Sequence, residues 1–309
     1  MSAHVRVELA AGGPSSPRSA ALSQSKGLER RSHAARDPGA LAALFIAATM
    51  AFMAGALILP LLAVFAEALR KGIGLYLSSV TEHDALAAIR LTLLVVVIAV
   101  PLNTVFGLAA AWAVTKFEFR GKQILLTLID LPLSISPVIS GLVFVLLYGA
   151  HGWFGPELRE MGIQIIFDVS GIVIATTLVT LPFVARELIP LMQAQGKDEE
   201  FAAATLGAST WRTFWQVTLP NIRWALLYGV LLCTARAMGE FGAVSVVSAR
   251  VRGETATMPL EVEILYNEYN ATGAFALASL LALFALVALA AKTILENQFA
   301  GDLAAQRRR

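Results

Sequence analysis

The sequence predicts an all-α polytopic membrane protein with about six transmembrane helices. The chain has 309 residues, of which 57% are apolar and only 15% are charged, and its mean hydropathy is +0.69. This composition is too apolar for an ordinary soluble domain. Six apolar segments each come near the roughly 20 residues that a helix needs to cross a bilayer: 41–66, 91–115, 124–149, 169–190, 223–248 and 272–292.

The rest of the composition argues against several other classes of protein. A net charge of +2 is too small to indicate nucleic-acid binding. Cys233 is the single cysteine, so no intrachain disulfide can form and a thiol function has no support. The four histidines are scattered without metal-ligand spacing, so the sequence predicts no metal site.

The two ends of the chain set the expected orientation. Residues 1–40 are rich in Ala, Ser, Gly and Arg and predict a disordered tail; a transmembrane domain is expected over 41–298 and a second basic tail over 299–309. The apolar run after the first tail is long enough to span, so we expect an uncleaved first helix. Seventeen Lys or Arg residues fall on the side of the tails, against six on the other side. The positive-inside rule therefore predicts that both ends are cytoplasmic.

The third apolar segment carries two prolines, Pro132 and Pro137, and one carboxylate, Asp130. Prolines release backbone carbonyls, which a membrane tolerates only where neighbouring helices, hydroxyl groups or water satisfy them. Nearby serines supply hydroxyl groups, so we expect a kinked helix packed inside the bundle. Asp130 either takes part in a transport pathway or lies near the cytoplasmic boundary, where water solvates it.

A polar and partly amphipathic loop over 196–222 separates the fourth and fifth apolar segments. Asp198 can cap a short helix that has acids in its first turn and three alanines after them. Gly207 then ends this helix, and Ser209 or Thr210 can cap a second one. The loop is thus expected to form a helix, a glycine bend and another helix.

The second helix of this loop is expected to end at Pro220, because the residue before a proline, here Leu219, is disfavoured in helical geometry. Phe214 and Val217, together with Trp211, supply an apolar stripe, and the alanines leave a low surface that another protein can approach closely. The loop predicts either a docking surface for a partner protein or a helical hairpin lying on the membrane.

The fifth apolar segment places Arg236 near its middle and Glu240 one turn later on the same face. A charged residue at this depth costs roughly 2.5 to 3.5 kcal/mol on insertion scales, so both side chains need partners or water. They can form a local ion pair, and Gly239 and Gly242 allow close helix packing. A face that lines or gates a pathway is favoured over these two structural roles, because ionisable residues within the membrane are functional candidates by default.

The loop over 196–222 resembles the signature of bacterial ABC-importer permeases. In that signature Glu-Ala-Ala, three residues, Gly, nine residues, an aliphatic residue, any residue and Leu-Pro form the helix that docks into the ATPase. Phe201 stands at the Glu position, and Glu200 lies one place earlier, turned about 100° around the helix. The matching residues are Ala202, Ala203, Gly207, Val217, Leu219 and Pro220.

Four further stretches extend the resemblance over about residues 85–292. Residues 235–243 are similar to the fifth-helix signature shared by sulfate and molybdate importer permeases. Residues 131–144, 181–192 and 221–232 resemble sulfate/thiosulfate permeases of the CysW type in particular. The resemblance implies the transmembrane fold of a type I ABC importer, with candidate pathway or gate residues Arg236, Gly239, Glu240, Gly242, Asp130 and Pro137.

The same resemblance implies a permease subunit of an ATP-driven importer for sulfate or thiosulfate, with molybdate or tungstate as the alternative cargo. Its partners would be a second homologous permease, a dimer of cytoplasmic ATPase subunits and a periplasmic sulfate/thiosulfate-binding protein, in the bacterial inner membrane. Neither Gly121-Lys122 nor Gly196-Lys197 continues into a P-loop, so ATP and Mg²⁺ would be used by another chain. We expect this chain to bind no cofactor and catalyse no reaction.

Two other functional classes remain open at this point. A stand-alone ion-coupled transporter or channel would need no partner, and the long capped loop argues against it. A membrane-embedded hydrolase could use Ser245 or Ser248, but no histidine lies in any predicted crossing.

Overall fold

The computed structural model describes residues 39–306, and the regular structure in that range is helical. Of the two predicted tails, 1–38 and 307–309 lie outside the described residues, whereas 299–306 continue the last helix. The described chain contains five stretches long and apolar enough to cross a membrane, or six if one bent pair of helices forms a span. This confirms the predicted fold class of about six transmembrane helices.

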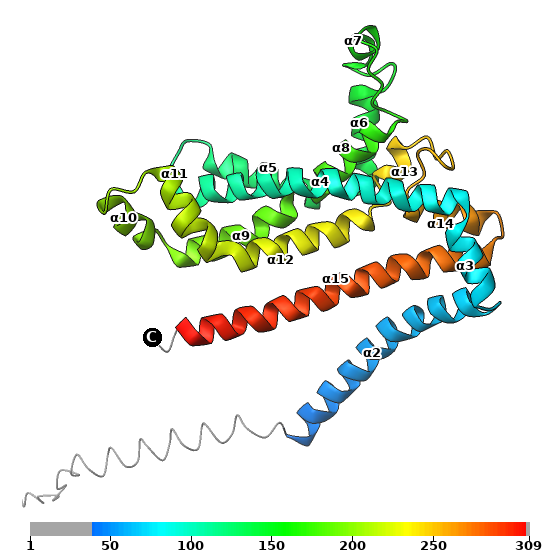
Figure 1. The fold of residues 1–309 in the computed structure, drawn as a ribbon, viewed down its shortest axis with the longest axis horizontal. Helices are drawn as coiled ribbons and strands as arrows, with labels where there is room; N and C mark the ends of the chain where they lie inside the picture. Colours follow the sequence, from blue (N-terminus) through cyan, green and yellow to red (C-terminus); the bar gives the residue numbers. More distant parts are fainter. Residues whose placement is uncertain (1–38, 307–309) are drawn as a thin grey trace, which may run out of the picture. The chain divides into compact units, whose positions relative to one another are not determined.

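The candidate spans correspond to named helices (Figure 1). They are α2 (Ala40–Leu69), α4 (His83–Lys116), α8 with α9 (Val169–Thr180 and Pro182–Gln195), α11 through α12 (Thr210–Thr213 to Leu219–Met238), α15 (Ala271–Gln306) and the bent pair α5 and α6 (Lys122–Ser134 and Pro137–Tyr148). Shorter helices connect them: α3 (Ile73–Thr81), α7 (Gly155–Glu160), α10 (Asp198–Thr205), α13 (Val244–Val247) and α14 (Met258–Asn267).

The chain divides into two compact units, Met1–Pro60 and Leu61–Arg309. The described part of the first unit is the beginning of α2, whose apolar side chains, such as Leu41, Met50 and Leu57, are exposed. A helix that is apolar all round suits a lipid environment.

The core of the second unit lies where α4, α9 and α12 pack together. Gly107 of α4 and Gly229 of α12 both face Val184 of α9: a Cβ on Gly107 would lie 2.8 Å from the Val184 Cβ, and one on Gly229 would lie 3.2 Å from its Cα. Small residues allow helices in lipid to approach this closely, which replaces the hydrophobic driving force that water would supply.

One buried polar residue, Asn103, ties α4 to α8. Its side-chain amide donates to the Thr180 hydroxyl over 2.7 Å and to the Thr177 carbonyl over 3.1 Å. Interhelical hydrogen bonds of this kind contribute about 0.6 kcal/mol each on average in membranes. They also fix the register in which the two helices meet.

The third predicted crossing is sharply broken and is not the single kinked helix that the prolines predicted. Helices α5 and α6 meet at 108°. Ile135 and Ser136 have extended backbones (ψ 139° and 134°), and Pro137 opens α6. A proline disfavours helical geometry in the residue before it, and Ser136 has left that geometry, so α5 does not continue into α6.

Candidate functional site

The polar loop between α9 and α12 folds as two short helices joined at Gly207. Gly207 has a φ of +84°, which glycine adopts without steric cost. Its N–H donates to the Ala204 carbonyl, and the next N–H, of Ala208, donates to the Ala203 carbonyl, both over 3.0 Å. This pair of bonds is the Schellman arrangement that closes a helix, and it confirms Gly207 as the end of α10.

The helix starts in this loop differ in part from the expected ones. Ser209 is the cap of α11, and its hydroxyl accepts from the Arg212 N–H over 3.3 Å. Of the two predicted caps, Ser209 and Thr210, the first is therefore the one that the structure has. The prediction that Asp198 caps α10 is wrong, because Asp198 is already the first helical residue and Lys197 precedes it. Three acidic side chains nevertheless occupy the first turn of α10, where the helix dipole favours them.

Pro220 does not end the second helix. Leu219 keeps helical geometry (φ −63°, ψ −43°), and the chain runs on as α12 with Pro220 in its first turn. Between α11 and α12 lies one π-helical turn, η1 (Phe214–Thr218), in which the Leu219 N–H donates to the Phe214 carbonyl. This wider turn accommodates a ring that would clash with the carbonyl four residues earlier in a regular helix.

The acidic residues of α10 hold it against the rest of the chain. Glu200 pairs with Lys116 at the end of α4 over 2.6 Å and accepts from the Thr218 hydroxyl over 3.1 Å. Glu199 accepts from the Asn221 side-chain amide. Glu200 therefore faces the rest of the chain. It lies one position before the Glu of the family signature, and at this position it pairs with Lys116 of the same chain.

Elsewhere the loop exposes four large apolar side chains. Phe201 is 64% exposed, Leu206 88%, Trp211 66% and Trp215 51%. We call these four residues the apolar docking face. Ala202 is exposed beside them, while Ala203, Val217 and Leu219 are half-buried and Pro220 is exposed.

Only part of the docking face could be read from the sequence. Phe214, predicted to belong to the apolar stripe, is buried and packs edge-on against Trp112 of α4 with ring centroids 5.2 Å apart. Leu206 and Trp215 were not predicted. Leu206 could have been found as a leucine next to a chain-reversing glycine, where no core is available to cover it.

A second candidate site surrounds Arg236 and Glu240. The predicted fifth crossing, 223–248, is wrong at its end, because the helix that contains its start runs from Thr210 to Met238 and stops at Gly239. Arg236 thus lies in the last turn of α12 rather than at the middle of a span, and Glu240 lies in the break before α13.

Arg236 and Glu240 form the ion pair that their spacing allowed. The guanidinium Nη1 lies 2.6 Å from Glu240 Oε2, and the Glu240 side chain is 1% exposed. Glu240 Oε1 also accepts from the Ala243 N–H over 2.9 Å. The carboxylate therefore connects the end of α12 to the start of α13, while the Arg236 side chain stays 33% exposed.

Two broken helices meet beside this ion pair. A Cβ on Gly242 would lie 2.9 Å from the Cβ of Pro137, and one on Gly141 would lie 2.9 Å from the Ala243 carbonyl oxygen. Helix α6 therefore lies directly against the loop that carries Glu240. Of the six predicted pathway residues, Arg236, Gly239, Glu240, Gly242 and Pro137 gather around these two breaks.

Asp130 is separate from this group. It pairs with Arg186 of α9 over 3.4 Å, and both side chains are more than half exposed. No group of three His, Cys, Asp or Glu residues that could hold a metal ion occurs in the part of the chain that the structure describes.

Comparison with known proteins decides the family. Residues 103–300 match the family described as "Binding-protein-dependent transport system inner membrane component". The chain belongs to this family. It is therefore a multi-pass membrane permease subunit of a bacterial-type ABC importer and is not itself an enzyme.

Named relatives of this permease subunit are sulfate transport permeases. The chain is 51% identical over 255 residues to "Sulfate transport system permease protein CysW" of Synechocystis sp., covering 82% of this chain and 92% of that one. It is 51% identical over 240 residues to CysW of Escherichia coli K12, covering 78% and 82%. With "Sulfate transport system permease protein CysT" of Escherichia coli K12 the identity is 32% over 256 residues, covering 83% and 92%.

A solved structure has the same fold. The chain matches a chain of the "bacterial alginate ABC transporter in complex with alginate pentasaccharide-bound periplasmic protein" with a TM-score of 0.68, at 16% identity, over 82% of this permease and 92% of that chain. Family membership decides against both the stand-alone transporter and the membrane-embedded hydrolase.

Proposed function

We propose that this chain is the CysW-type permease subunit of an ATP-driven importer for sulfate and thiosulfate. The observation that carries the proposal is the 51% identity to sulfate permeases over most of both chains. Identity to the CysT permease is much lower, at 32%. The second permease of the complex is then a CysT-like subunit, and the two together enclose the pathway.

The apolar docking face is the proposed contact with the ATPase. Phe201, Leu206 and the two tryptophans are each more than half exposed on this loop, and large apolar side chains left uncovered mark a surface for a partner. The signature residues Ala202 and Ala203 lie between them on α10. Two ATPase copies would bind the two permeases, and ATP with Mg²⁺ would be bound there.

This assignment fixes the proposed orientation. An ATPase is cytoplasmic, so α10 and α11 face the cytoplasm and the connections at the other end of α8 and α12 face the periplasm. The excess of Lys and Arg on the α10 side supports the same orientation. Both chain ends are then cytoplasmic, because six crossings return the chain to its starting side.

The Arg236–Glu240 pair is the proposed gate. A guanidinium binds oxyanion oxygens in a forked geometry, and the exposed third of Arg236 leaves part of it free to do so. The paired carboxylate lowers the attraction, which suits a passage that must release sulfate. Selectivity would then reside in the periplasmic binding protein.

Uptake of radiolabelled sulfate in a strain that lacks this subunit tests the proposal. Expression of the chain should restore uptake, and unlabelled thiosulfate should compete while molybdate should not. Competition by molybdate with no competition by thiosulfate would instead assign the subunit to a molybdate importer. Copurification of an ATPase subunit tests the docking assignment separately.

A further inference from the structure

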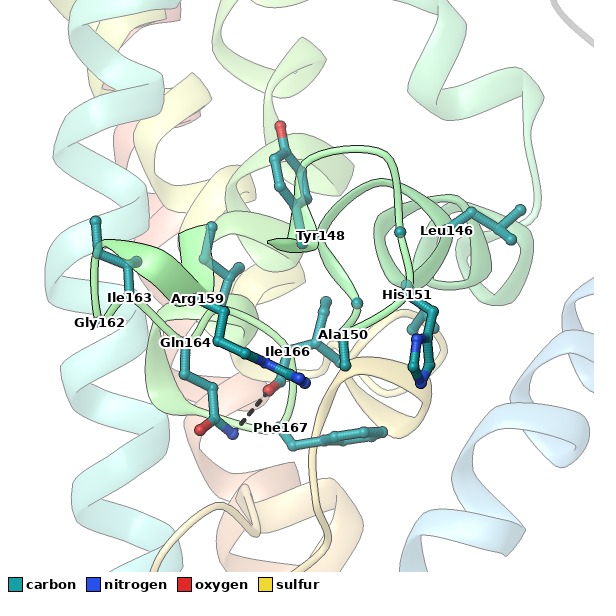
Figure 2. Close-up of a pocket in the computed structure, with 15 residues that line it drawn as sticks. Leu146, Tyr148, Ala150, His151, Arg159, Gly162, Ile163, Gln164, Ile166 and Phe167 are labelled. Carbon is teal, nitrogen blue, oxygen red and sulfur yellow. Dashed lines mark hydrogen bonds between the residues drawn. The ribbon is translucent and has the colours of Figure 1, made fainter. Parts of the chain in front are cut away.

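A cavity of about 680 Å³ lies in the connection between α6 and α8, which faces the periplasm in the orientation proposed above. Residues 145–167 supply its whole lining. Figure 2 shows the Arg159 side chain extending into this cavity, with Gln164 on one side and His151 on the other. We call it the outer pocket, and none of the functions assigned above uses it.

Glycines give the outer pocket a fixed shape. A Cβ on Gly155 would lie 1.9 Å from the Gly149 carbonyl oxygen, and one on Gly152 would lie 2.6 Å from the Leu146 carbonyl oxygen. The Trp153 and Phe154 N–H groups donate back to carbonyls of α6 over 3.1 and 2.8 Å. The backbone is therefore folded tightly onto the end of α6, and the pocket is formed before any partner arrives.

The surface around the outer pocket is suited to a protein partner. Trp153 is 80% exposed, Met161 65% and Phe167 53%, so the segment that forms the pocket carries large exposed apolar side chains. The Arg159 guanidinium forms no ion pair or side-chain hydrogen bond within residues 39–306. An aromatic and arginine-containing surface of this kind is typical of interface hot spots, and the unpaired cation favours an acidic group on the partner.

The outer pocket is connected to the proposed gate by direct contacts. Phe167, which lines the pocket, holds an unfavourable φ of +67° and donates its N–H to the Val247 carbonyl over 2.8 Å. Ile166 packs in one buried cluster with Val244 and Ala243. Ala243 in turn donates its N–H to Glu240. Helix α13 thus lies between the pocket and the Arg236–Glu240 pair.

We propose that the outer pocket receives an acidic protrusion of the substrate-loaded periplasmic binding protein, and that α13 carries this contact to Glu240. The proposal rests on the proposed function, which supplies the orientation and the partner. A structural neighbour crystallised with a periplasmic protein bound, which supports a partner of this class. The strained Phe167 is consistent with a segment that stores energy for a movement.

Filling the pocket tests the docking step. Ala150 lines the pocket and is exposed, so Ala150→Trp should occupy it without disturbing the fold. In the complete transporter in lipid nanodiscs, we expect affinity for the sulfate-loaded binding protein to fall about tenfold, as for loss of one hot spot. Arg159→Glu should weaken binding similarly. The matched control is Ser78→Trp on α3, which adds the same side chain at an exposed position outside the pocket without changing a charge, and should change the affinity less than about twofold.

A variant remote from the pocket opening tests the transmission step. Val247→Ala should leave binding-protein affinity unchanged but should lower the stimulation of ATPase activity by saturating binding protein about fivefold, because α13 then packs loosely. Full stimulation in Val247→Ala would overturn the role of α13.

The results distinguish a failure of the docking proposal from a failure of the proposed function. If the unmodified transporter binds the sulfate-binding protein and both pocket variants bind it equally well, the docking site is wrong while the function stands. If the unmodified transporter binds no such protein, the proposed function itself fails. If the purified Ala150→Trp complex has lost the second permease, the occupant of the pocket is that permease, and the proposal is overturned. If the Arg159→Glu transporter no longer binds sulfate in the absence of the binding protein, the occupant is the anion, and the proposal is likewise overturned.

Discussion

Two ion pairs of equal length differ in position and burial in this permease subunit. Lys116–Glu200 and Arg236–Glu240 both have a nitrogen and an oxygen 2.6 Å apart. The first joins helices far apart in the chain at an end of the bundle, where the Lys116 side chain is 8% exposed and that of Glu200 is 21% exposed. The second lies within one turn of chain, and its carboxylate is 1% exposed. Water can replace the lost partner in the first pair but has little access to the carboxylate of the second.

The largest effect is expected from breaking the second pair on one side. Arg236→Met leaves the buried Glu240 carboxylate without its cation, which should destabilise the subunit by about 3 kcal/mol and abolish uptake. Thermal unfolding of the purified complex measures the loss. The control is Arg186→Met, which breaks the exposed pair with Asp130 and should cost less than about 1 kcal/mol. Equal losses in the two variants would mean that burial of Glu240 does not matter.

Removing both partners should separate stability from transport. Arg236→Met combined with Glu240→Gln leaves no unpaired charge, so the complex should assemble with a stability within about 1 kcal/mol of the unmodified protein. We expect sulfate uptake to fail nonetheless, because no guanidinium then meets the anion. Near-normal uptake in the assembled double variant would reduce the pair to a structural role.

An intermediate effect is expected at the bend that presents the docking face. Gly207 has a positive φ with open space around its Cα, so Gly207→Val adds no clash but costs about 1 to 2 kcal/mol of backbone strain. The loop should relax to another conformation. ATP hydrolysis should then continue without uptake, which simultaneous measurement of phosphate release and sulfate import in proteoliposomes would detect. Coupled transport at the unmodified rate would contradict this role of the bend.

The smallest effect is expected from the first ion pair. Lys116→Met removes a partner of Glu200. The Lys116 side chain is 8% exposed and that of Glu200 is 21% exposed, so the carboxylate left behind can still turn to water, and the loss of stability should be about 1 kcal/mol. Binding of the ATPase should weaken only a few-fold, because the Schellman closure at Gly207 and the Thr218 bond still hold α10. Complete loss of ATPase copurification would show that Lys116 acts directly at the interface.

The same contrast explains which features the sequence could predict. The Arg236–Glu240 pair followed from its spacing, and the Gly207 bend and the Ser209 cap followed from local backbone chemistry. The partner of Glu200 did not, because Lys116 is brought to it only by the packing of α4 against the rest of the bundle.

The errors have local causes that a single sequence conceals. Pro220 was expected to end a helix because a proline disfavours helical geometry in the residue before it, yet Leu219 stays helical and one π turn makes room for the proline ring. The apolar run 223–248 reads as one crossing, yet Gly239 interrupts it, and the contact between Gly242 and Pro137 that packs this break against α6 joins distant parts of the chain. Hydropathy reports only how apolar a segment is, and cannot report where its helix ends.

The π turn also keeps the chain helical from Thr210 to Met238, so one continuous element connects the docking face to Arg236. Helices bend at π turns, and η1 lies between α11 and α12. A push on α11 from the cytoplasm would therefore meet a hinge at Phe214–Thr218 before it reached α12. Movement of the docking face would then arrive at Arg236 as a change in the bend of this helix.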